Sequence, residues 1–256
     1  MRFKDKIVII TGGARGIGAE TALKFAENGA KVAIFDLNIQ GAKETAAQIQ
    51  RGDGTCSTFS VDVTNREEVQ NAVEKVFREY EKIDILINNA GTLKDNLSGQ
   101  LTEDEWDFVL DVNLKGSFIC SQAVQKYMVQ QGYGKIVMTS SQAAVGAPGR
   151  VNYAAAKAGI QGMMKTLAIE LGPYGINVNA VAPGFIETEM SKVSEEYAKR
   201  RGIENFTEYK KAMIQRNPIR RVGQPEDVAN VILFLASEDA DYVTGQVIYV
   251  SGAPVV

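Results

Sequence analysis

The chain has 256 residues, of which 45% are hydrophobic and 23% charged, a composition typical of a globular protein rather than a disordered or fibrous one. Its formal net charge of −3 and its lack of a basic cluster argue against nucleic acid as a partner. No apolar run is long enough for a membrane span or the core of a signal peptide, so we expect a cytoplasmic protein. No linker, repeat or low-complexity segment divides the sequence, and we expect one domain over residues 1–256.

The residue types that usually handle protons and metals are scarce. The sequence contains no histidine, which removes the most common general base and the most common metal ligand. Its two cysteines, Cys56 and Cys120, lack the close spacing of a metal site, and we expect buried thiols in a reducing compartment. We therefore expect no metal, and proton transfer through tyrosine, lysine or a carboxylate.

Short β-branched runs alternate with helical stretches along the whole chain. Strands are predicted at residues 6–10, 31–35, 55–61, 83–87, 134–138, 176–181 and 247–250. Helices are predicted at residues 19–27, 42–50, 66–80, 103–130 (with breaks) and about 153–171. This alternation predicts an α/β protein of the Rossmann-like, doubly wound type, with one parallel seven-stranded sheet and helices on both faces.

A glycine-rich turn lies between the first predicted strand and the first predicted helix. Glycine at Gly12, Gly16 and Gly18 lets backbone amides approach a pyrophosphate, and the helix N-terminus presents unpaired N–H groups and a positive dipole. The spacing is GxxxGxG rather than the GxGxxG of the most common dinucleotide fingerprint. In this strand–turn–helix setting we interpret the turn as a dinucleotide site, with ordinary turn chemistry as the alternative.

The end of the second strand bears on the choice between two cofactors. Asp36 falls about twenty residues after the glycines, where a carboxylate accepts both ribose hydroxyls of adenosine and repels a 2′-phosphate. Arg15, in the turn, favours the other cofactor, since a guanidinium pairs with a 2′-phosphate. Because Asp36 is expected to lie nearer the ribose, we favour NAD(H) and keep NADP(H) as the alternative.

Two later strand ends carry polar residues at the same edge of the sheet. Asp62 follows the third strand and is expected either to bind an adenine amino group or to cap the following helix. Residues 88–91, Asn-Asn-Ala-Gly, end the fourth strand beside the point where the strand order reverses. Open α/β sheets bind ligands at that point, so we expect part of the site there.

The helix that begins near residue 153 carries the most reactive pair. Tyr153 and Lys157 are four residues apart and project from one helix face. An ammonium about 4 Å from a phenol, at an effective dielectric of about 20, favours the phenolate by about 4 kcal/mol, or about 3 pKa units. We therefore expect Tyr153 to titrate near working pH and to serve as a general acid and base. On this spacing alone, a solvated surface pair is the alternative.

The segment between the sixth and seventh strands, about residues 185–217, breaks the regular alternation. It is polar and helical in pattern, with scattered large apolar residues. Because an insertion at this place in the fold lies next to the expected site, we predict a helical lid over the substrate. A solvated pair of surface helices is the alternative.

Together these residues resemble the short-chain dehydrogenase/reductase family, of the compact type, over nearly the whole chain. The resemblance rests on motifs in the family's order and spacing: Thr11-Gly12-x-x-x-Gly16-x-Gly18, Asp62, Asn88-Asn89-Ala90-Gly91, Asn113, Ser140, Tyr153-x-x-x-Lys157, Pro183-Gly184 and Thr188. It implies the strand order 3-2-1-4-5-6-7. It also implies a homotetramer in which helices near residues 114–128 and 154–171 pair between subunits.

The resemblance further implies a role for each site residue. Tyr153 would be the acid/base, and Ser140, thirteen residues before it, would hold the same substrate oxygen, with Ser141 a neighbour of the same chemistry. Lys157 would lower the pKa of Tyr153 and bind the nicotinamide ribose, while Asn113 would hold a water that relays the proton. The implied cofactor contacts are Gly12, Arg15, Gly16, Ile17, Gly18, Asp36, Leu37, Asp62, Val63, Asn89, Ala90, Gly91, Tyr153, Lys157, Pro183, Gly184, Ile186 and Thr188.

The expected activity is hydride transfer between NAD(H) and a small secondary alcohol or ketone. Within the family the chain is most similar to bacterial 3-oxoacyl-carrier-protein reductases and secondary-alcohol dehydrogenases, so reduction of a 3-oxoacyl thioester with NADPH is the alternative. Docking of an acidic carrier would need a basic rim, which residues 130–131 and 172–174 do not supply. A third hypothesis is a sensor that binds the nucleotide without catalysis; the complete set Asn113, Ser140, Tyr153 and Lys157 argues against it.

Overall fold

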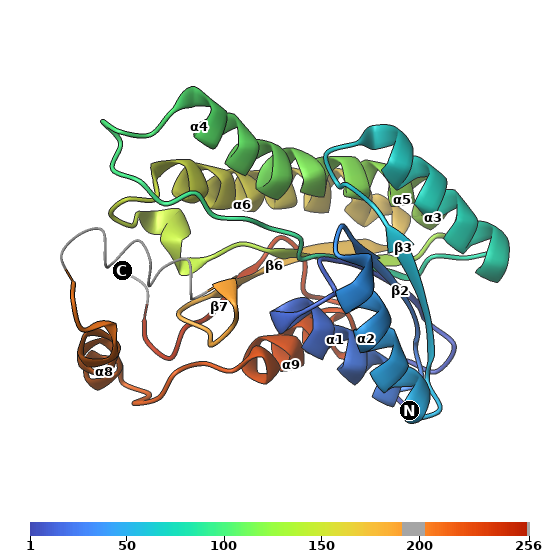
Figure 1. Ribbon diagram of the computed structural model, residues 1–256. Coiled ribbons are helices and arrows are strands. Elements are labelled where there is room, and N and C mark those ends of the chain that lie inside the picture. The colour runs from blue at the N-terminus through green and yellow to red at the C-terminus, as the bar shows by residue number, and fades with distance from the viewer. Residues whose placement is uncertain (191–202, 255–256) are drawn as a thin grey trace.

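The computed structural model describes residues 1–190 and 203–254. Its centre is a seven-stranded sheet in the order β3-β2-β1-β4-β5-β6-β7, in which every neighbouring pair is parallel (Figure 1). The strands are β1 (Ile7–Thr11), β2 (Lys31–Asp36), β3 (Thr55–Ser60), β4 (Ile85–Asn88), β5 (Gly134–Thr139), β6 (Ile176–Pro183) and β7 (Val247–Val250). The predicted fold class and strand order are confirmed.

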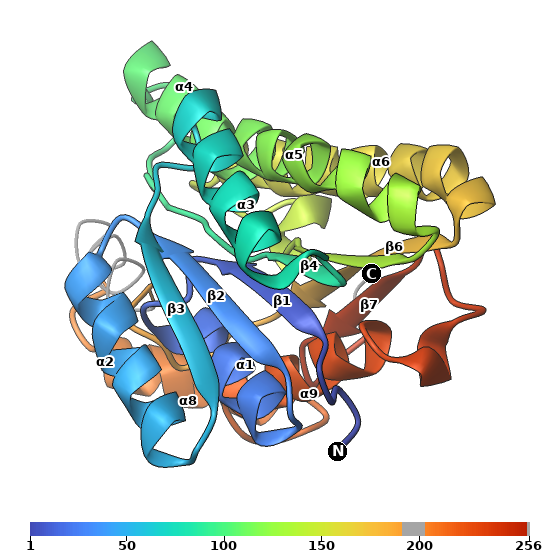
Figure 2. The same cartoon turned by 90° about the vertical axis from the view of Figure 1, so that its right-hand side faces the viewer.

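Helices cover both faces of the sheet (Figure 2). One face packs against α3 (Arg66–Tyr80), α5 (Gly116–Gln131) and α6 (Val151–Leu171), with α4 (Glu103–Leu110) beyond them. The other packs against α1 (Gly16–Glu27), α2 (Ile39–Arg51) and α9 (Pro225–Leu235). The central strands are apolar on both sides: Ile7 and Ile9 enter the first core, while Val8 and Ile10 enter the second. This double burial explains the unbroken apolar runs.

The predicted helix and strand boundaries agree with the structure to within a few residues. The helix at 66–80 and the last strand at 247–250 coincide with α3 and β7, and β6 runs two residues further than predicted, to Pro183. Helix α9 was not among the predicted elements. Its start carries a clear signal, because Pro225 occupies the first turn and Gln224 and Asp227 form a reciprocal cap.

The long helical region after β4 is interrupted at one point. Between α4 and α5 the backbone forms a π-helical turn, Asp111–Lys115, and Asn113 in this turn is fully buried. A π turn inserts an extra residue into a helix, and such insertions are frequent at functional sites. The turn rotates the helix so that Asn113 faces the end of β4, toward Gly91.

The predicted lid, residues 185–217, lies partly outside the described residues. Within it the structure describes α8 (Phe206–Arg216), whose first turn is capped by Asn205, the side chain of which accepts from the amide of Glu208. Lys210 in this helix forms an ion pair of 2.5 Å with Glu187, which follows β6. Among the described residues, no helix is long and apolar enough to cross a membrane.

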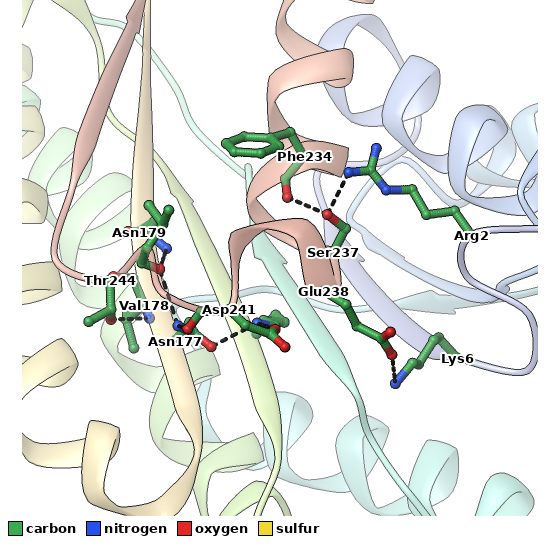
Figure 3. A network of polar contacts seen from close by, with 12 residues as sticks. Arg2, Lys6, Asn177, Val178, Asn179, Phe234, Ser237, Glu238, Asp241 and Thr244 are labelled. Atoms are coloured by element: carbon green, nitrogen blue, oxygen red, sulfur yellow. Dashed lines mark hydrogen bonds and ion pairs between the residues drawn. The ribbon is translucent and has the colours of Figure 1, made fainter.

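A network of polar contacts holds the amino-terminal edge of the sheet together (Figure 3). Lys135 at the start of β5 is buried, and its Nζ lies 2.7 Å from Oδ1 of Asn177 and 2.6 Å from Oδ1 of Asp241. Nearby, Arg2 donates to Ser237 and Lys6 pairs with Glu238. Because the strands are parallel, this network lies at the edge opposite the polar strand ends described below.

Candidate active site

Two adjoining cavities open at the carboxyl-terminal edge of the sheet. The larger, of about 580 Å³, is lined by the segments that follow β1, β2, β3 and β4. The smaller, of about 130 Å³, is lined by the segments that follow β4, β5 and β6 and by the start of α6. Five residues line both cavities: Ile17, Asn89, Gly91, Thr188 and Met190. The two cavities therefore form one continuous site.

The glycine turn shapes the floor of the larger cavity. Gly12 and Gly16 have φ values of +68° and +58°, which residues with a side chain rarely adopt, and both glycines line the cavity. Arg15, the residue before α1, makes no side-chain cap, so the first amides of the helix remain available to an anion. Gly18 does not line either cavity; a Cβ there would lie 2.0 Å from the carbonyl oxygen of Gly12, so this glycine lets α1 pack against the turn.

Asp36 is fixed at the far end of the larger cavity. Its carboxylate accepts from the amide of Ala14 at 2.9 Å and from the amide of Asn38 at 2.8 Å. The guanidinium of Arg15, which favoured NADP(H) in the sequence, pairs instead with the carboxylate of Glu189. The charge that this end presents is therefore dominated by a fixed carboxylate, with Leu37 beside it.

Asp62 and Val63 form the wall after β3. The Asp62 carboxylate accepts from the amide and the hydroxyl of Thr64, at 2.8 and 2.7 Å, and it lines the larger cavity. The alternative role of Asp62 as the helix cap is wrong, because Asn65 caps α3 by accepting from the amides of Glu67 and Glu68. Asp62 thus remains a candidate for contact with an adenine ring.

The end of β4 is held against the glycine turn. The hydroxyl of Thr11 accepts from the amides of Asn89 and Ala90, both at 3.0 Å, and the Asn89 side chain donates to the carbonyl of Gly12 at 3.0 Å. Asn88 points away from the cavities and donates to Ser121. These bonds bring Asn89, Ala90 and Gly91 to the junction of the two cavities.

Tyr153 and Lys157 lie on the first turns of α6, and both line the smaller cavity. The Nζ of Lys157 is 5.4 Å from the centroid of the Tyr153 ring and donates to the carbonyl of Thr139 at 2.7 Å. Burial in an apolar environment disfavours the ammonium and lowers the pKa of Lys157 to about 7. The solvated-pair alternative is wrong, since both side chains are buried.

The pKa of Tyr153 in this structure is set by burial and by three polar neighbours, while the effect expected of Lys157 stays a prediction. Burial raises the pKa of Tyr153, and it outweighs the hydrogen bond with Ser141 and the positive charge of Arg150, which both lower that pKa. Asp95 adds to the increase.

The two serines after β5 have different partners. Ser140 donates its hydroxyl to the carbonyl of Lys157 at 2.9 Å and accepts from the side chain of Gln161 at 3.1 Å. Side chains alternate along a strand, so Ser140 shares the face of Met138, which packs in the core beneath α6. The hydroxyl of Ser141 is the one that hydrogen-bonds with Tyr153.

Asn113 faces the junction from the π-helical turn. Its Nδ2 donates to the carbonyls of Thr92 and Val109 at 3.0 and 2.9 Å. Its Oδ1 is buried and has no hydrogen-bond partner among the described residues. A Cβ at Gly91 would lie 2.7 Å from this oxygen and 3.6 Å from Nζ of Lys157, so the glycine keeps space between the two polar groups. The space suits a water or a ribose hydroxyl.

The structure brings nearly all predicted site residues to the two cavities. All four predicted catalytic residues line the smaller one: Asn113, Ser140, Tyr153 and Lys157. Of the predicted cofactor contacts, Gly12, Arg15, Gly16, Ile17, Asp36, Leu37, Asp62, Val63, Asn89, Ala90, Gly91 and Thr188 line the larger cavity, and Pro183, Gly184 and Ile186 line the smaller one.

Several lining residues were not predicted as part of the site. Phe108, Asn38 and Thr92 line the larger cavity, and Arg150 lines the smaller one. Phe108 belongs to α4, which the sequence pattern did not place near the cofactor. Arg150 stands three residues before Tyr153, and this proximity was the available signal.

Comparisons with known proteins agree with this geometry. A family profile described as enoyl-(acyl carrier protein) reductase matches residues 12–252. A 3-oxoacyl-[acyl-carrier-protein] reductase of Thermotoga maritima is 44% identical over 100% of both chains. The (2S)-[(R)-hydroxy(phenyl)methyl]succinyl-CoA dehydrogenase subunit BbsD of Thauera aromatica is 39% identical over 98% of this chain and 97% of its own.

A solved structure supports the same grouping. The crystal structure of levodione reductase superimposes with a TM-score of 0.93 at 36% identity, covering 98% of each chain. The aligned length, the sheet order and the paired Tyr153 and Lys157 all agree with one family. The chain is a member of the short-chain dehydrogenase/reductase family, and hence an oxidoreductase of hydroxyl and keto groups that works with a nicotinamide cofactor.

Proposed function

We propose that this enzyme transfers a hydride between NAD(H) and a small secondary alcohol or ketone, with Tyr153 as the general acid and base. The observation that carries the proposal is the position of Tyr153 and Lys157, buried side by side in the smaller cavity, which adjoins the larger one. A cofactor in the larger cavity would present its reactive end to a substrate in the smaller one. A sensor that only binds nucleotide would have no use for this pair.

The larger cavity fits a dinucleotide. The positive φ angles of Gly12 and Gly16 and the uncapped first turn of α1 suit a pyrophosphate, and the fixed carboxylate of Asp36 suits ribose hydroxyls. The bound nicotinamide supplies the hydride chemistry. The residues around it supply position, charge and a route for the proton.

Each polar residue of the smaller cavity has a distinct task in this proposal. Tyr153 gives its proton to the substrate oxygen in reduction and takes one from the hydroxyl in oxidation. Ser141, rather than the expected Ser140, donates a hydrogen bond to the same oxygen, because its hydroxyl lies beside Tyr153. Lys157 would hold the nicotinamide ribose, and the unpartnered Oδ1 of Asn113 would fix a water that continues the proton route from Lys157.

Asp36 supports NAD(H) over NADP(H). Its carboxylate is held by two backbone amides and would repel a 2′-phosphate, while Arg15 pairs with Glu189. Of Asp36, Arg15 and Glu189, only Arg15 is a cation, and its guanidinium is paired with Glu189 rather than left for a 2′-phosphate. We expect Kd for NADH to be at least about tenfold lower than for NADPH.

The alternative substrate is a 3-oxoacyl thioester, as the name of the Thermotoga maritima relative suggests. The relative from Thauera aromatica is named for a CoA thioester, and levodione reductase for a small ketone. The ends of α5 and α6 lack lysine and arginine at residues 130–131 and 172–174, where an acidic carrier protein would need them. We therefore favour a substrate without a carrier protein.

An activity panel tests the proposal. Ketones, secondary alcohols and acetoacetyl-CoA are assayed with NADH and NADPH, using wild type and Tyr153→Phe. We expect turnover with NADH and a loss of at least about 10²-fold in Tyr153→Phe. Equal activity of the two proteins on every substrate would remove the catalytic role of Tyr153. Faster turnover of acetoacetyl-CoA with NADPH would select the thioester alternative.

We also propose a cytoplasmic homotetramer. Both cysteines are free thiols, as expected in a reducing compartment, and large apolar side chains are exposed on α5 and α6, notably Phe118 and Ile169. Sedimentation at micromolar concentration should give four times the chain mass of 27.8 kDa. A monomeric mass would refute the assembly without affecting the chemistry.

A further inference from the structure

The smaller cavity contains a second cation besides Lys157. Arg150 is the residue that precedes α6, and it lines the cavity. Its Nε and one terminal nitrogen both lie 2.9 Å from Oδ2 of Asp95. The Asp95 side chain is 0% exposed and the Arg150 side chain 26% exposed, so the accessible part of this ion pair belongs to Arg150. Asp95 itself does not line the cavity.

The backbone around this pair is also tied down. The amide of Asn96 donates to the carbonyl of Gly149 at 2.9 Å, and Asn96 and Arg150 form an isolated parallel bridge. The loop after β4 and the loop before α6 are therefore joined at the position of the ion pair. Arg150 is held in one place, one helical turn before Tyr153.

A structural role alone does not account for this arrangement. Removing two charges from water costs about as much as their attraction returns, so a largely buried ion pair is weak evidence for stabilisation. The described residues that line the cavity include two cations, Arg150 and Lys157, and no carboxylate. The wall that a substrate meets is therefore positive at Arg150, and a planar guanidinium matches the geometry of a carboxylate.

We propose that Arg150, oriented by Asp95, is a subsite for the carboxylate of a short oxo acid or hydroxy acid substrate. The proposal rests on the proposed function and narrows its substrate class. Arg150 stands three residues before Tyr153 and lines the same cavity of about 130 Å³, so we expect a short carbon chain between the carboxylate and the reacting carbonyl. The carboxylate would bind at Arg150 while the carbonyl oxygen lies at Tyr153 and Ser141.

A matched pair of substrates tests the subsite. Acetoacetate and ethyl acetoacetate carry the same ketone, but only the first carries a charge. In wild type, kcat/KM for acetoacetate should exceed that for the ester by at least about tenfold, because charge-assisted hydrogen bonds contribute on this scale. Arg150→Gln should reduce this ratio by about 10- to 100-fold, mainly through the KM for acetoacetate.

Two further variants separate charge from structure. Arg150→Lys keeps the charge without the planar fork and should retain part of the selectivity. Lys94→Gln removes a positive charge from the same loop as Asp95, but Lys94 is exposed and lines neither cavity, so its ratio should equal that of wild type. Thermal unfolding of each variant identifies any general loss of folding.

An unchanged ratio in Arg150→Gln, or a wild type that prefers the ester, would overturn the subsite. If wild type reduces neutral ketones through Tyr153 and the ratio does not move, only the subsite fails. If no ketone or alcohol reacts and Tyr153→Phe matches wild type, the proposed function fails instead. Partial selectivity in Arg150→Lys, together with its loss in Arg150→Gln, would establish the positive charge at this position as the anion-binding group.

Discussion

At the scale of single residues, burial controls the protonation of the site more strongly than the contact between the two ionisable partners. Tyr153 and Lys157 are both removed from water, and removal from water disfavours phenolate and ammonium alike. Without cofactor the pair therefore holds a neutral phenol and a partly neutral amine near pH 7. Charges that arrive with the cofactor and substrate must complete the activation of Tyr153.

The first prediction concerns the pH dependence of stability without cofactor. Lys157 has a pKa of about 7 in the folded chain and about 10.5 when unfolded, so between these values the unfolded state binds more protons. Stability contributed at this site therefore rises with pH from 7 towards 10.5. Relative to Lys157→Met, wild type should gain about 1.5 kcal/mol between pH 7 and pH 8.5 in urea unfolding.

The comparison between these two proteins isolates the lysine. Burial also raises the pKa values of the Cys56 and Cys120 thiols to about 12, so the unfolded chain loses these protons first and stability falls above about pH 8. This loss is the same in wild type and Lys157→Met. Parallel pH profiles for wild type and Lys157→Met would show that the amine is already charged in the folded chain.

The second prediction separates the two serines. Ser141→Ala should lower kcat by about 10²-fold, the usual effect of removing a hydrogen-bond donor to a developing oxyanion. It should also shift the pKa that governs the pH profile of the oxidation to higher pH, because Tyr153 loses a hydrogen bond that lowers its pKa. Ser140→Ala should mainly reduce thermal stability, since the Ser140 hydroxyl ties the end of β5 to Lys157 and Gln161 of α6. A larger loss of kcat in Ser140→Ala would return the role to Ser140.

The sequence led to Ser140 because spacing was the only information it offered. Ser141 lies twelve residues before Tyr153, one fewer than the family spacing implies. Both serines line the smaller cavity, and the partners of each hydroxyl depend on where β5 ends and on which face its last residues lie. The hydroxyl of Ser140 bonds to the carbonyl of Lys157, and this contact, which favours Ser141 for the role, is not encoded in any local sequence pattern.

At the scale of elements, close packing between α1 and the glycine turn fixes the floor of the larger cavity. Gly18 faces the carbonyl of Gly12, and the side chain of Asn89 lies 2.6 Å from where a Cβ would be. Helix α1 can therefore approach β1 only without a side chain at this position. The helix N-terminus is consequently presented directly to the larger cavity.

The third prediction tests this contact. Gly18→Ala should weaken NADH binding and lower the free energy of unfolding by at least about 2 kcal/mol, since the added Cβ meets backbone that cannot move aside. Gly172→Ala is the matched control: Gly172 has φ −53° and ψ −42°, and no heavy atom lies within 4 Å of its Cβ position. The control should raise stability by about 0.5 kcal/mol. Equal effects of both substitutions on NADH binding would contradict the packing role.

Periodicity made most elements predictable, because the central strands are apolar on both faces and α3 carries apolar residues at helical spacing. The π-helical turn at Asp111–Lys115 was not predictable beyond a break in the helix, since one extra residue leaves little trace in a periodic pattern. Its effect, the inward position of Asn113, required the three-dimensional arrangement. Likewise, Arg150 becomes a site residue only when Asp95 is brought beside it from another loop.

At the scale of the whole molecule, the two edges of the sheet have separate tasks. The carboxyl-terminal edge carries the two cavities, and the amino-terminal edge carries the polar network shown in Figure 3. Lys135 bonds to Asn177 and Asp241 of this network. A buried lysine depends on its partners, because an unpaired charge in the interior costs several kcal/mol. Changes to the network should therefore alter stability without altering the chemistry.

The fourth prediction follows from this separation. Asp241→Ala should lower the free energy of unfolding by about 2 kcal/mol or more, because it leaves the buried Lys135 with Asn177 alone. Asp239→Ala, in the same segment, breaks only the exposed pair with Arg2 and should cost less than about 1 kcal/mol. Both variants should keep the wild-type KM for NADH. Equal unfolding energies for the two variants would show that Lys135 does not rely on Asp241.

The carboxylate of Asp36 has a practical consequence for anyone who wishes to run this catalyst on the phosphorylated coenzyme. Replacing Asp36 alone would leave the backbone amides of Ala14 and Asn38 without the acceptor to which they now donate. Arg15 would still be bound to Glu189. Re-engineering therefore calls for a coupled exchange, Asp36→Ser together with Glu189→Gln, in which a hydroxyl takes over an amide and the freed guanidinium turns to the phosphate.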